Sequence, residues 1–176
     1  IILKHLYGNM NKLIIFDLDG VLIDSRELHY EALNLALGEQ NTRYVITREE
    51  HLSTFDGLNT TRKLQLLTEL KELPTNLHNI VWSRKQELTF DLLRKFIPSL
   101  KLISICQKLK ELGYKIAVAS NSIRETVKLS LMSIGVLEYV DYFISNQDVK
   151  RTKPYPEMYW KCMTELDVIP KHTVII

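Results

Sequence analysis

The sequence has few cysteines, little excess of charge of either sign and no long apolar run. Two cysteines in 176 residues exclude a disulfide framework and indicate a reducing, cytoplasmic environment. The net charge of +2 comes from scattered basic residues, which argues against a nucleic-acid partner. No apolar run approaches the length of a membrane-spanning helix, so no membrane partner is expected.

Signals for processing, repetition and zinc binding are missing as well. The opening Ile1–Leu3 is too short for the core of a signal peptide. Met10 has the character of a natural start, so residues 1–9 are interpreted as a leader or tag. The five histidines have no metal-ligand spacing, which argues against zinc. There are no repeats, and nothing in the sequence indicates the oligomeric state.

Short β-rich runs alternate with amphipathic helices in two parts of the chain. Strands are predicted at residues 13–16, 116–119, 142–144 and 173–176. The helical stripes Leu102-Ile105-Leu109-Leu112 and Ile123-Val127-Leu131-Ile134 lie between strands and end at Gly113 and Gly135. This alternation predicts an α/β fold with a parallel sheet and right-handed crossovers.

The stretch from Ser25 to about Pro98 interrupts this alternation, because it contains helices and no convincing strand. Four helices are predicted there, at residues 25–37, from the capping box at Thr47, at 59–70 and at 76–96. We therefore expect an α/β core of residues 10–24 and 99–176, with an inserted helical domain of residues 25–98. The leucine stripes and Trp82 of this block are interpreted as its core, and Trp160 likewise as a packing residue of the other part.

Two aspartates directly follow the first predicted strand, in Asp17-Leu18-Asp19-Gly20. The carboxyl edge of an open α/β sheet is where ligands bind, and two close carboxylates favour a hard cation. Gly20 lets the backbone turn tightly beside a ligand. An ordinary Asp-Gly turn explains the motif about equally well when it is taken alone.

Two later segments place polar groups at comparable positions. Ser120 and Asn121 follow the second strand and precede a helix, which suits either an anion site or a plain N-cap. Lys153 lies in a loop stiffened by Pro154 and Pro156. It suits either a lysine that neutralises a phosphoryl group or an ordinary solvated lysine. The order of the three signals, each just after a strand or strand-like segment, favours a shared phosphoryl-binding site.

These motifs resemble those of the haloacid dehalogenase superfamily, in the subgroup of phosphoglycolate phosphatases and β-phosphoglucomutases. Residues 16–25 (FDLDGVLIDS) resemble its first motif, residues 119–122 (ASNS) its second and residues 153–157 (KPYPE) its third. The resemblance extends over nearly the whole chain from Lys12. It implies a Rossmann-like core with an inserted helical cap.

The resemblance also implies roles for these residues. Asp17 would attack phosphorus and form an aspartyl-phosphate, while Asp19 would act as general acid and base. Phosphoryl oxygens would be held by Ser120, Asn121, Lys153 and the backbone N–H groups near Leu18 and Gly20. Mg²⁺ would be bound by the Asp17 carboxylate and the Asp19 carbonyl. The second aspartate argues against dehalogenation, which has no leaving oxygen to protonate.

One element of the family pattern, an acidic pair after the fourth strand that completes the Mg²⁺ site, has no counterpart before Ile176. We interpret the end at Ile176 as a truncation that removes the C-terminal part of the core. The alternative is a real loss that leaves a metal-poor protein.

Three residues of the helical block are candidates for contact with substrate: His29, Gly57 and Arg62. His29 is equally well explained as a partly buried surface histidine. Gly57 lies in Phe55-Asp56-Gly57-Leu58, which resembles the family's substrate-reading loop. A solvated helix face is the alternative for Arg62 and for its neighbour Lys63.

The function predicted from these residues is Mg²⁺-dependent hydrolysis of a small phosphorylated metabolite, such as a sugar phosphate or phosphoglycolate. A phosphomutase is the rival among enzymes, because it uses the same two aspartates. A protein that binds a phosphorylated ligand without catalysis is the rival from another class.

Overall fold

The computed structural model of the chain describes residues 12–176, which divide into two compact units. The first contains the described residues up to Ile23 together with Ile97–Ile176, and the second is Asp24–Phe96. The sequence placed these boundaries at residues 24/25 and 98/99. The interpretation of residues 1–9 lies outside the described part of the chain. Each unit is described by itself below.

The first unit is built on a parallel sheet, as the sequence predicted. Its strands in spatial order are β3 (Tyr142–Ile144), β2 (Tyr114–Ala119), β1 (Lys12–Asp17) and β4 (Thr173–Ile175). β1 pairs in parallel with β2 on one side and β4 on the other. Leu13 and Ile15 of this strand are fully buried, as expected of a continuous apolar run with neighbours on both sides.

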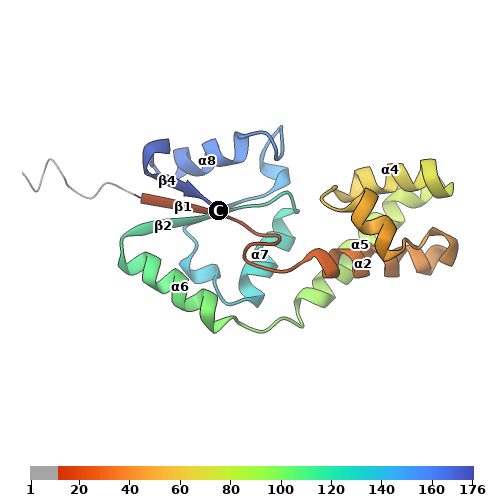
Figure 1. Ribbon diagram of the computed structural model, residues 1–176, viewed down its shortest axis with the longest axis horizontal. Helices are drawn as coiled ribbons and strands as arrows, with labels where there is room; N and C mark the ends of the chain where they lie inside the picture. The colour runs from red at the N-terminus through yellow and green to blue at the C-terminus, as the bar shows by residue number, and fades with distance from the viewer. Residues whose placement is uncertain (1–11) are drawn as a thin grey trace, which may run out of the picture. The chain divides into compact units, whose positions relative to one another are not determined.

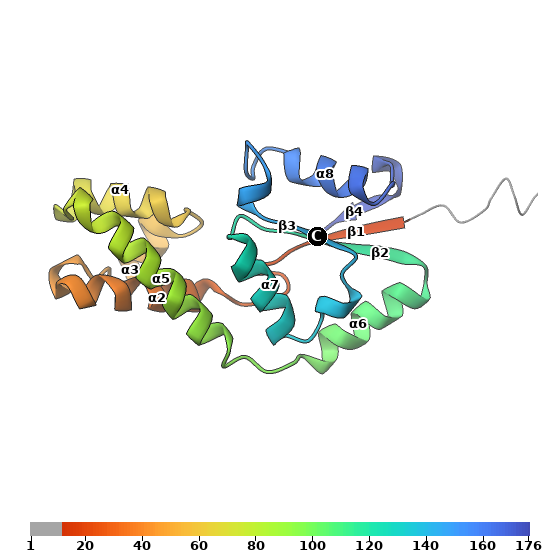
Figure 2. The same ribbon diagram turned by 180° about the vertical axis from the view of Figure 1, so that it is seen from behind.

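Three helices cover the sheet: α6 (Leu100–Glu111), α7 (Arg124–Ser133) and α8 (Glu157–Glu165). α8 lies over one face, and α6 and α7 lie under the other (Figures 1 and 2). These crossovers bring the carboxyl ends of β1, β2 and β3 to one edge of the sheet. Short 3₁₀ turns follow or precede the elements of this unit at Leu137–Tyr139, Asn146–Asp148 and Pro170–His172.

Two packing predictions for this unit were wrong, and helix phase explains both. In α6 the buried face centres on Cys106, so Ile105 and Leu112 are 41% and 58% exposed. In α8 the buried side chains include Met158 and Cys162, and Trp160 lies two positions from each. Because two positions correspond to about 200° around a helix, Trp160 points outward and is 54% exposed.

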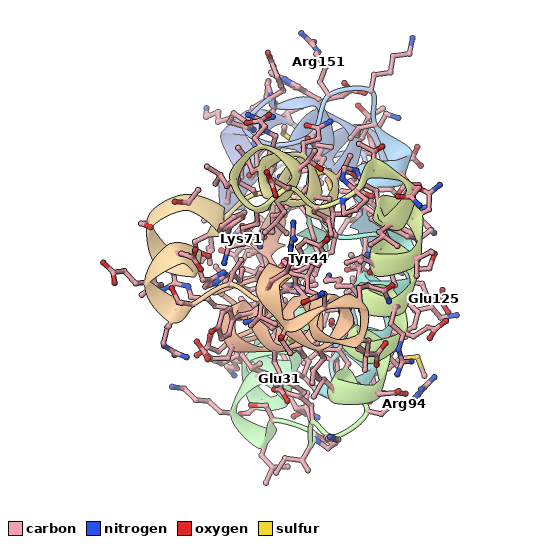
Figure 3. The ribbon with its side chains drawn as sticks, turned by 90° about the vertical axis from the view of Figure 1, so that its right-hand side faces the viewer. Glu31, Tyr44, Lys71, Arg94, Glu125 and Arg151 are labelled. Carbon is pink, nitrogen blue, oxygen red and sulfur yellow. The ribbon has the colours of Figure 1, made fainter. Side chains whose placement is uncertain are left out.

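The second unit is helical, with no strand among its residues. Its elements are α2 (Arg26–Gln40), α3 (Arg48–Glu50), a π-helical turn (His51–Phe55), α4 (Thr60–Lys71) and α5 (His78–Leu93), with 3₁₀ turns at Thr42–Tyr44 and Thr75–Leu77. The predicted capping box of Thr47 and Glu50 is confirmed. Lys71, labelled in Figure 3, joins the end of α4 to this region by donating to the Val45 carbonyl (2.7 Å) and to Glu50 (3.0 Å).

The core of the helical unit is apolar and includes Leu37, Phe55, Leu67, Leu73 and Val81. Trp82 packs against this cluster, as predicted. The predicted core stripe Leu66-Leu70-Leu73 was wrong at Leu70, which is 61% exposed. Among the described residues, no helix combines the length and the apolarity needed to cross a bilayer.

Two glycines end helices of the first unit with positive φ, and they differ in their surroundings. Gly113 follows α6 (φ 80°), and no atom lies within 4 Å of a Cβ placed on it. Gly135 follows α7 (φ 78°), and a Cβ there meets Ile103 Cδ1 and Pro98 Cβ at 3.0 Å.

Gly135→Ala is therefore expected to cost more stability than Gly113→Ala. The left-handed backbone alone costs about 1 kcal/mol in both variants. The added contact raises the loss at Gly135 to about 2–4 kcal/mol. Urea unfolding monitored by circular dichroism measures the two free energies, and equal losses would contradict this account.

Candidate active site

Asp17 and Lys153 form an ion pair at the carboxyl edge of the sheet. Asp17 is the last residue of β1, and its Oδ1 accepts hydrogen bonds from Lys153 Nζ and from the Leu18 N–H, both at 2.7 Å. Lys153 Nζ also donates to the Ala119 carbonyl at the end of β2 (3.1 Å). The lysine side chain is 15% exposed and that of the aspartate 36%. Lys153 is therefore not a solvated loop residue, because it lies across the ends of two adjacent strands.

The turn after β1 is held by its own backbone. The Leu18 carbonyl accepts from the Leu22 and Ile23 N–H groups (both 3.0 Å), and the Gly20 N–H donates to the Ile23 carbonyl (2.8 Å). Gly20 has φ 83°, which suits a glycine at this turn. The N–H groups of Leu18 and Gly20, expected to hold phosphoryl oxygens, both have internal acceptors here. A phosphoryl group would have to replace those acceptors.

Asp19 lies beside the hydroxyl groups that follow β2. Ser120 is fully buried, and its Oγ donates to Asp19 Oδ2 at 3.3 Å. Ser122 Oγ reaches the same oxygen at 3.4 Å, and its N–H donates to Ser120 Oγ at 3.0 Å. The structure thus brings the second aspartate of the first motif to the serines of the second. Ser122 is not among the site residues predicted from the sequence, and the sequence signal for its position is its i+2 spacing from Ser120.

Asn121 contacts the backbone on both sides of the Lys153 residue. Its Oδ1 accepts from the Lys153 N–H (3.0 Å), and its Nδ2 donates to the Lys153 carbonyl (3.2 Å). The role of Asn121 in phosphate binding stays a prediction. In this structure its side chain fixes the backbone of the lysine.

The loop before Lys153 is fixed from the other side by Glu157, in the first turn of α8. Its two carboxylate oxygens accept from the N–H groups of Lys150 (2.9 Å) and Arg151 (3.0 Å). These backbone hydrogen bonds hold the pKa of Glu157 below its usual value. The Arg151 side chain extends outward at the edge of the unit (Figure 3). Of the three cations in this loop, Lys150, Arg151 and Lys153, only Lys153 forms an ion pair with Asp17.

The end of β3 supports the turn that carries the serines. The Asn146 N–H donates to the Ser122 carbonyl (3.2 Å), and Ser145 caps the following 3₁₀ turn by pairing with Asp148. Burial raises the pKa of Asp148, but hydrogen bonds from Ser145 and the charge of Arg124 outweigh it and lower that pKa overall. The carboxyl ends of three strands therefore contribute to one site.

The donor set suits a hard cation held by few protein ligands. Asp17 Oδ2 accepts no hydrogen bond from the described residues, which leaves one carboxylate oxygen open. Mg²⁺ commonly uses one or two carboxylates together with water and substrate phosphate. Among the described residues there is no group of three His, Cys, Asp or Glu side chains able to hold a metal. The residues present therefore fit Mg²⁺ as a partial ligand set.

The three candidates in the helical unit differ in their surroundings. His29 is half-buried on α2, with Nδ1 3.4 Å from Lys85 Nζ. Gly57 is exposed with φ 73°. The Arg62 side chain is half-exposed, donates to Gln65 (3.3 Å) and lies 3.9 Å from Glu69. Nothing in these contacts distinguishes Arg62 from a solvated helix residue.

The arrangement at the sheet edge combines a carboxylate with an open oxygen, an ammonium group at contact distance and a second carboxylate bound to hydroxyls. A carboxylate can attack an electrophilic centre, and the ammonium and hydroxyl groups can stabilise an oxyanion. The second carboxylate can exchange protons with a leaving group or water. Such a set suits phosphoryl transfer.

Comparison with known proteins agrees with this chemistry. Residues 14–176 match the family model described as haloacid dehalogenase-like hydrolase. Pyrophosphatase PpaX from Bacillus cereus is 25% identical over 173 residues, which cover 93% of this chain and 72% of that protein.

Two solved structures are similar in fold. CbbY from Rhodobacter sphaeroides, in complex with xylulose-1,5-bisphosphate, has a TM-score of 0.81 at 23% identity and covers 94% of this chain and 77% of its own. β-Phosphoglucomutase from Clostridium difficile has a TM-score of 0.76 at 20% identity and covers 94% and 75%. At these identities the likeness shows the fold.

Proposed function

Because the chain belongs to the haloacid dehalogenase-like hydrolase family, we propose that it hydrolyses a small phosphorylated metabolite through an aspartyl-phosphate on Asp17. The observation that carries this proposal is the 2.7 Å contact between Lys153 Nζ and Asp17 Oδ1 at the ends of adjacent parallel strands. It leaves Oδ2 as the oxygen that attacks phosphorus, with a cation beside it to stabilise the phosphoryl charge.

The first step transfers the phosphoryl group to the protein. Asp17 Oδ2 forms a bond to phosphorus, the bond from phosphorus to the ester oxygen breaks, and that oxygen takes a proton from Asp19. Lys153 and the Ser120 hydroxyl contact the phosphoryl oxygens as their charge increases. Ser120 now donates to Asp19 (3.3 Å), so it must turn to do this, while Ser122 (3.4 Å) can keep the carboxylate in place.

The second step releases phosphate. Asp19, now ionised, takes a proton from water, and the resulting hydroxide attacks phosphorus. The bond from phosphorus to Asp17 breaks and the free carboxylate returns. The same residue thus serves as acid and then as base, in the order that regenerates the starting protonation state.

The Asp17 carboxylate and the Asp19 main-chain carbonyl would hold Mg²⁺. When bound, Mg²⁺ supplies positive charge that offsets the phosphoryl negative charge. The chemistry of the donors supports this part of the proposal, since both are hard oxygen ligands. We infer a cytoplasmic location, which the low number of cysteines supports.

A phosphatase screen with a Mg²⁺ and an EDTA arm tests the proposal. The panel contains sugar phosphates, phosphoglycolate, pyrophosphate and a bisphosphorylated sugar, and both released phosphate and remaining ester are measured. Mg²⁺-dependent phosphate release is the expected result. An isomerised ester without net phosphate release would favour a phosphomutase, the activity named for one structural neighbour. Binding of esters without turnover in either arm would overturn the proposal.

Lys153→Met is expected to lower kcat/KM by roughly 10²–10³-fold, because the phosphoryl charge loses its cation. Steady-state kinetics on the best substrate of the panel measures the effect. Lys150→Met is the matched control, since Lys150 is an exposed lysine of the same loop. Similar kinetics for the two variants would contradict the role of Lys153.

A further inference from the structure

His51 is a buried histidine of the helical unit whose imidazole makes no hydrogen bond. It is 2% exposed, and neither ring nitrogen has a hydrogen-bond partner among the described residues. Its ring lies 4.9 Å from that of Tyr30, between centroids, and the Tyr30 hydroxyl donates to the Ile46 carbonyl instead (3.2 Å). Because buried polar groups in proteins are almost always hydrogen-bonded, this histidine requires a physical explanation.

The charged groups that act on the imidazole belong to α2, to α4 and to the loop after the π-helical turn: Arg26, Glu27, Lys63 and Asp56. Both carboxylates among them already have an arginine partner. Asp56 Oδ2 lies 3.3 Å from Arg26 Nε, and Glu27 accepts two hydrogen bonds of 2.6 Å from Arg48. Asp56 Oδ1 accepts from the Gly57 N–H (3.1 Å) and is 3.9 Å from His51 Nε2, which is too long for a hydrogen bond.

These surroundings disfavour a proton on the ring. Burial has the largest effect and the charge of Lys63 the next, and together they lower the pKa of His51 below its ordinary value of about 6.5. The charges of Asp56 and Glu27 oppose this shift only in part. A water-exposed imidazole therefore binds a proton more readily than this buried one. As the pH falls below about 6.5 toward the lowered pKa, the buried arrangement loses stability relative to an open one.

The backbone at His51 can open locally. The π-helical turn His51–Phe55 is a single turn, and the hydrogen bond from the Asp56 N–H to the His51 carbonyl (2.8 Å) closes it. Of its five residues, only His51 and Phe55 are buried. The next two residues, Asp56 and Gly57, are exposed. Two side chains thus anchor this turn in the core of the unit, and one of them is titratable.

We propose that His51 is a pH-sensitive switch of the helical unit, whose protonation opens the turn His51–Phe55 and frees the loop at Asp56 and Gly57. A protonated imidazole has a positive charge and two N–H donors, and the closed arrangement places no acceptor within hydrogen-bond distance of either donor. Exposure to water satisfies the charge and both donors, and Phe55 alone then anchors the turn. The switch is independent of the proposed phosphoryl transfer, because it uses none of the residues at the sheet edge.

Hydrogen exchange of the whole chain, measured from about pH 7.5 to about pH 5 and expressed as protection factors, tests the switch. The Asp56 amide reports on the turn, and the amides of α5 report on the rest of the helical unit. We expect the opening constant of the turn to rise by up to about tenfold per pH unit below about pH 6.5, the limit for one proton, while α5 stays protected. An opening constant that does not change with pH, or an equal rise in α5, would overturn the proposal.

Variants of two histidines make the test specific. His51→Leu has an apolar side chain of comparable size that binds no proton, and it should remove the pH dependence of the Asp56 amide. His78→Gln is the matched control and should retain it, because His78 lies in the same unit but has Thr68 Oγ1 as a partner (2.8 Å). If His51→Leu does not fold, His51→Gln replaces it. A pH dependence that persists in the His51 variant would assign the effect to a carboxylate and overturn the proposal, whatever the phosphatase screen shows.

Discussion

Asp17→Asn is expected to lower the rate of phosphate release by on the order of 10⁴-fold or more, the scale on which removal of a nucleophile acts. Asparagine keeps the shape of the side chain but has neither the charge nor the nucleophilic oxygen. Lys153 keeps its hydrogen bond to the Ala119 carbonyl (3.1 Å), so the site should stay assembled. Phosphate release under saturating substrate measures the effect.

Two further measurements separate loss of chemistry from loss of structure. Asp91→Asn is the matched control, because its exposed pair with Arg94 (2.7 Å) contributes little to stability. Inorganic phosphate should bind Asp17→Asn at least as tightly as the native chain, since a negative charge next to the anion is gone. Equal turnover in the native chain and in Asp17→Asn would refute the proposed mechanism.

The sequence was sufficient to place Asp17 and Lys153 at one edge of a sheet. Continuous apolar runs identified the strands, and parallel strands connected by helices must end at the same edge. The structure confirms the parallel fold and adds the 2.7 Å contact between the two side chains. The parallel direction of the strands follows from the alternation of strands and helices along the chain, which explains why it could be inferred from the sequence pattern.

The partners of Asn121 could not be predicted in the same way. Its two hydrogen bonds join residues 32 positions apart, and they depend on the path of the loop before Lys153. An asparagine after a strand can cap a helix, bind phosphate or hydrogen-bond to the backbone of a distant loop, and the sequence around it is the same in all three cases.

Helix phase limited the predictions for side chains on helices. Arg62 and Lys63 are adjacent cations that composition does not distinguish, yet one is half-exposed and the other is 7% exposed. Adjacent positions differ by about 100° around a helix, so a small error in phase exchanges the buried and solvated residue. The same sensitivity applies to Ile105 and Cys106 of α6.

Asp19→Asn is expected to divide the reaction into its two steps. With an alkyl phosphate the leaving alkoxide needs a proton, so the first step should slow by roughly 10²–10⁴-fold. With p-nitrophenyl phosphate the leaving phenolate is stable without one, and the first step should survive. The second step still lacks its base. The variant should therefore release about one equivalent of p-nitrophenolate in a burst and then turn over slowly.

Rapid-mixing absorbance of p-nitrophenolate measures the burst, and acid quenching traps the phosphorylated protein that should accumulate with it. Asparagine can still contact the hydroxyls of Ser120 and Ser122, so the change removes proton exchange and leaves the local packing in place. If the variant hydrolyses alkyl and aryl esters with equally reduced rates and shows no burst, Asp19 does not exchange protons. Its role would then be positioning or cation binding alone. A burst confined to the aryl ester would require that one carboxylate protonates the leaving group and later activates water. Asp19 is the candidate for both roles, because it follows Asp17 by two residues and contacts the hydroxyls of Ser120 and Ser122.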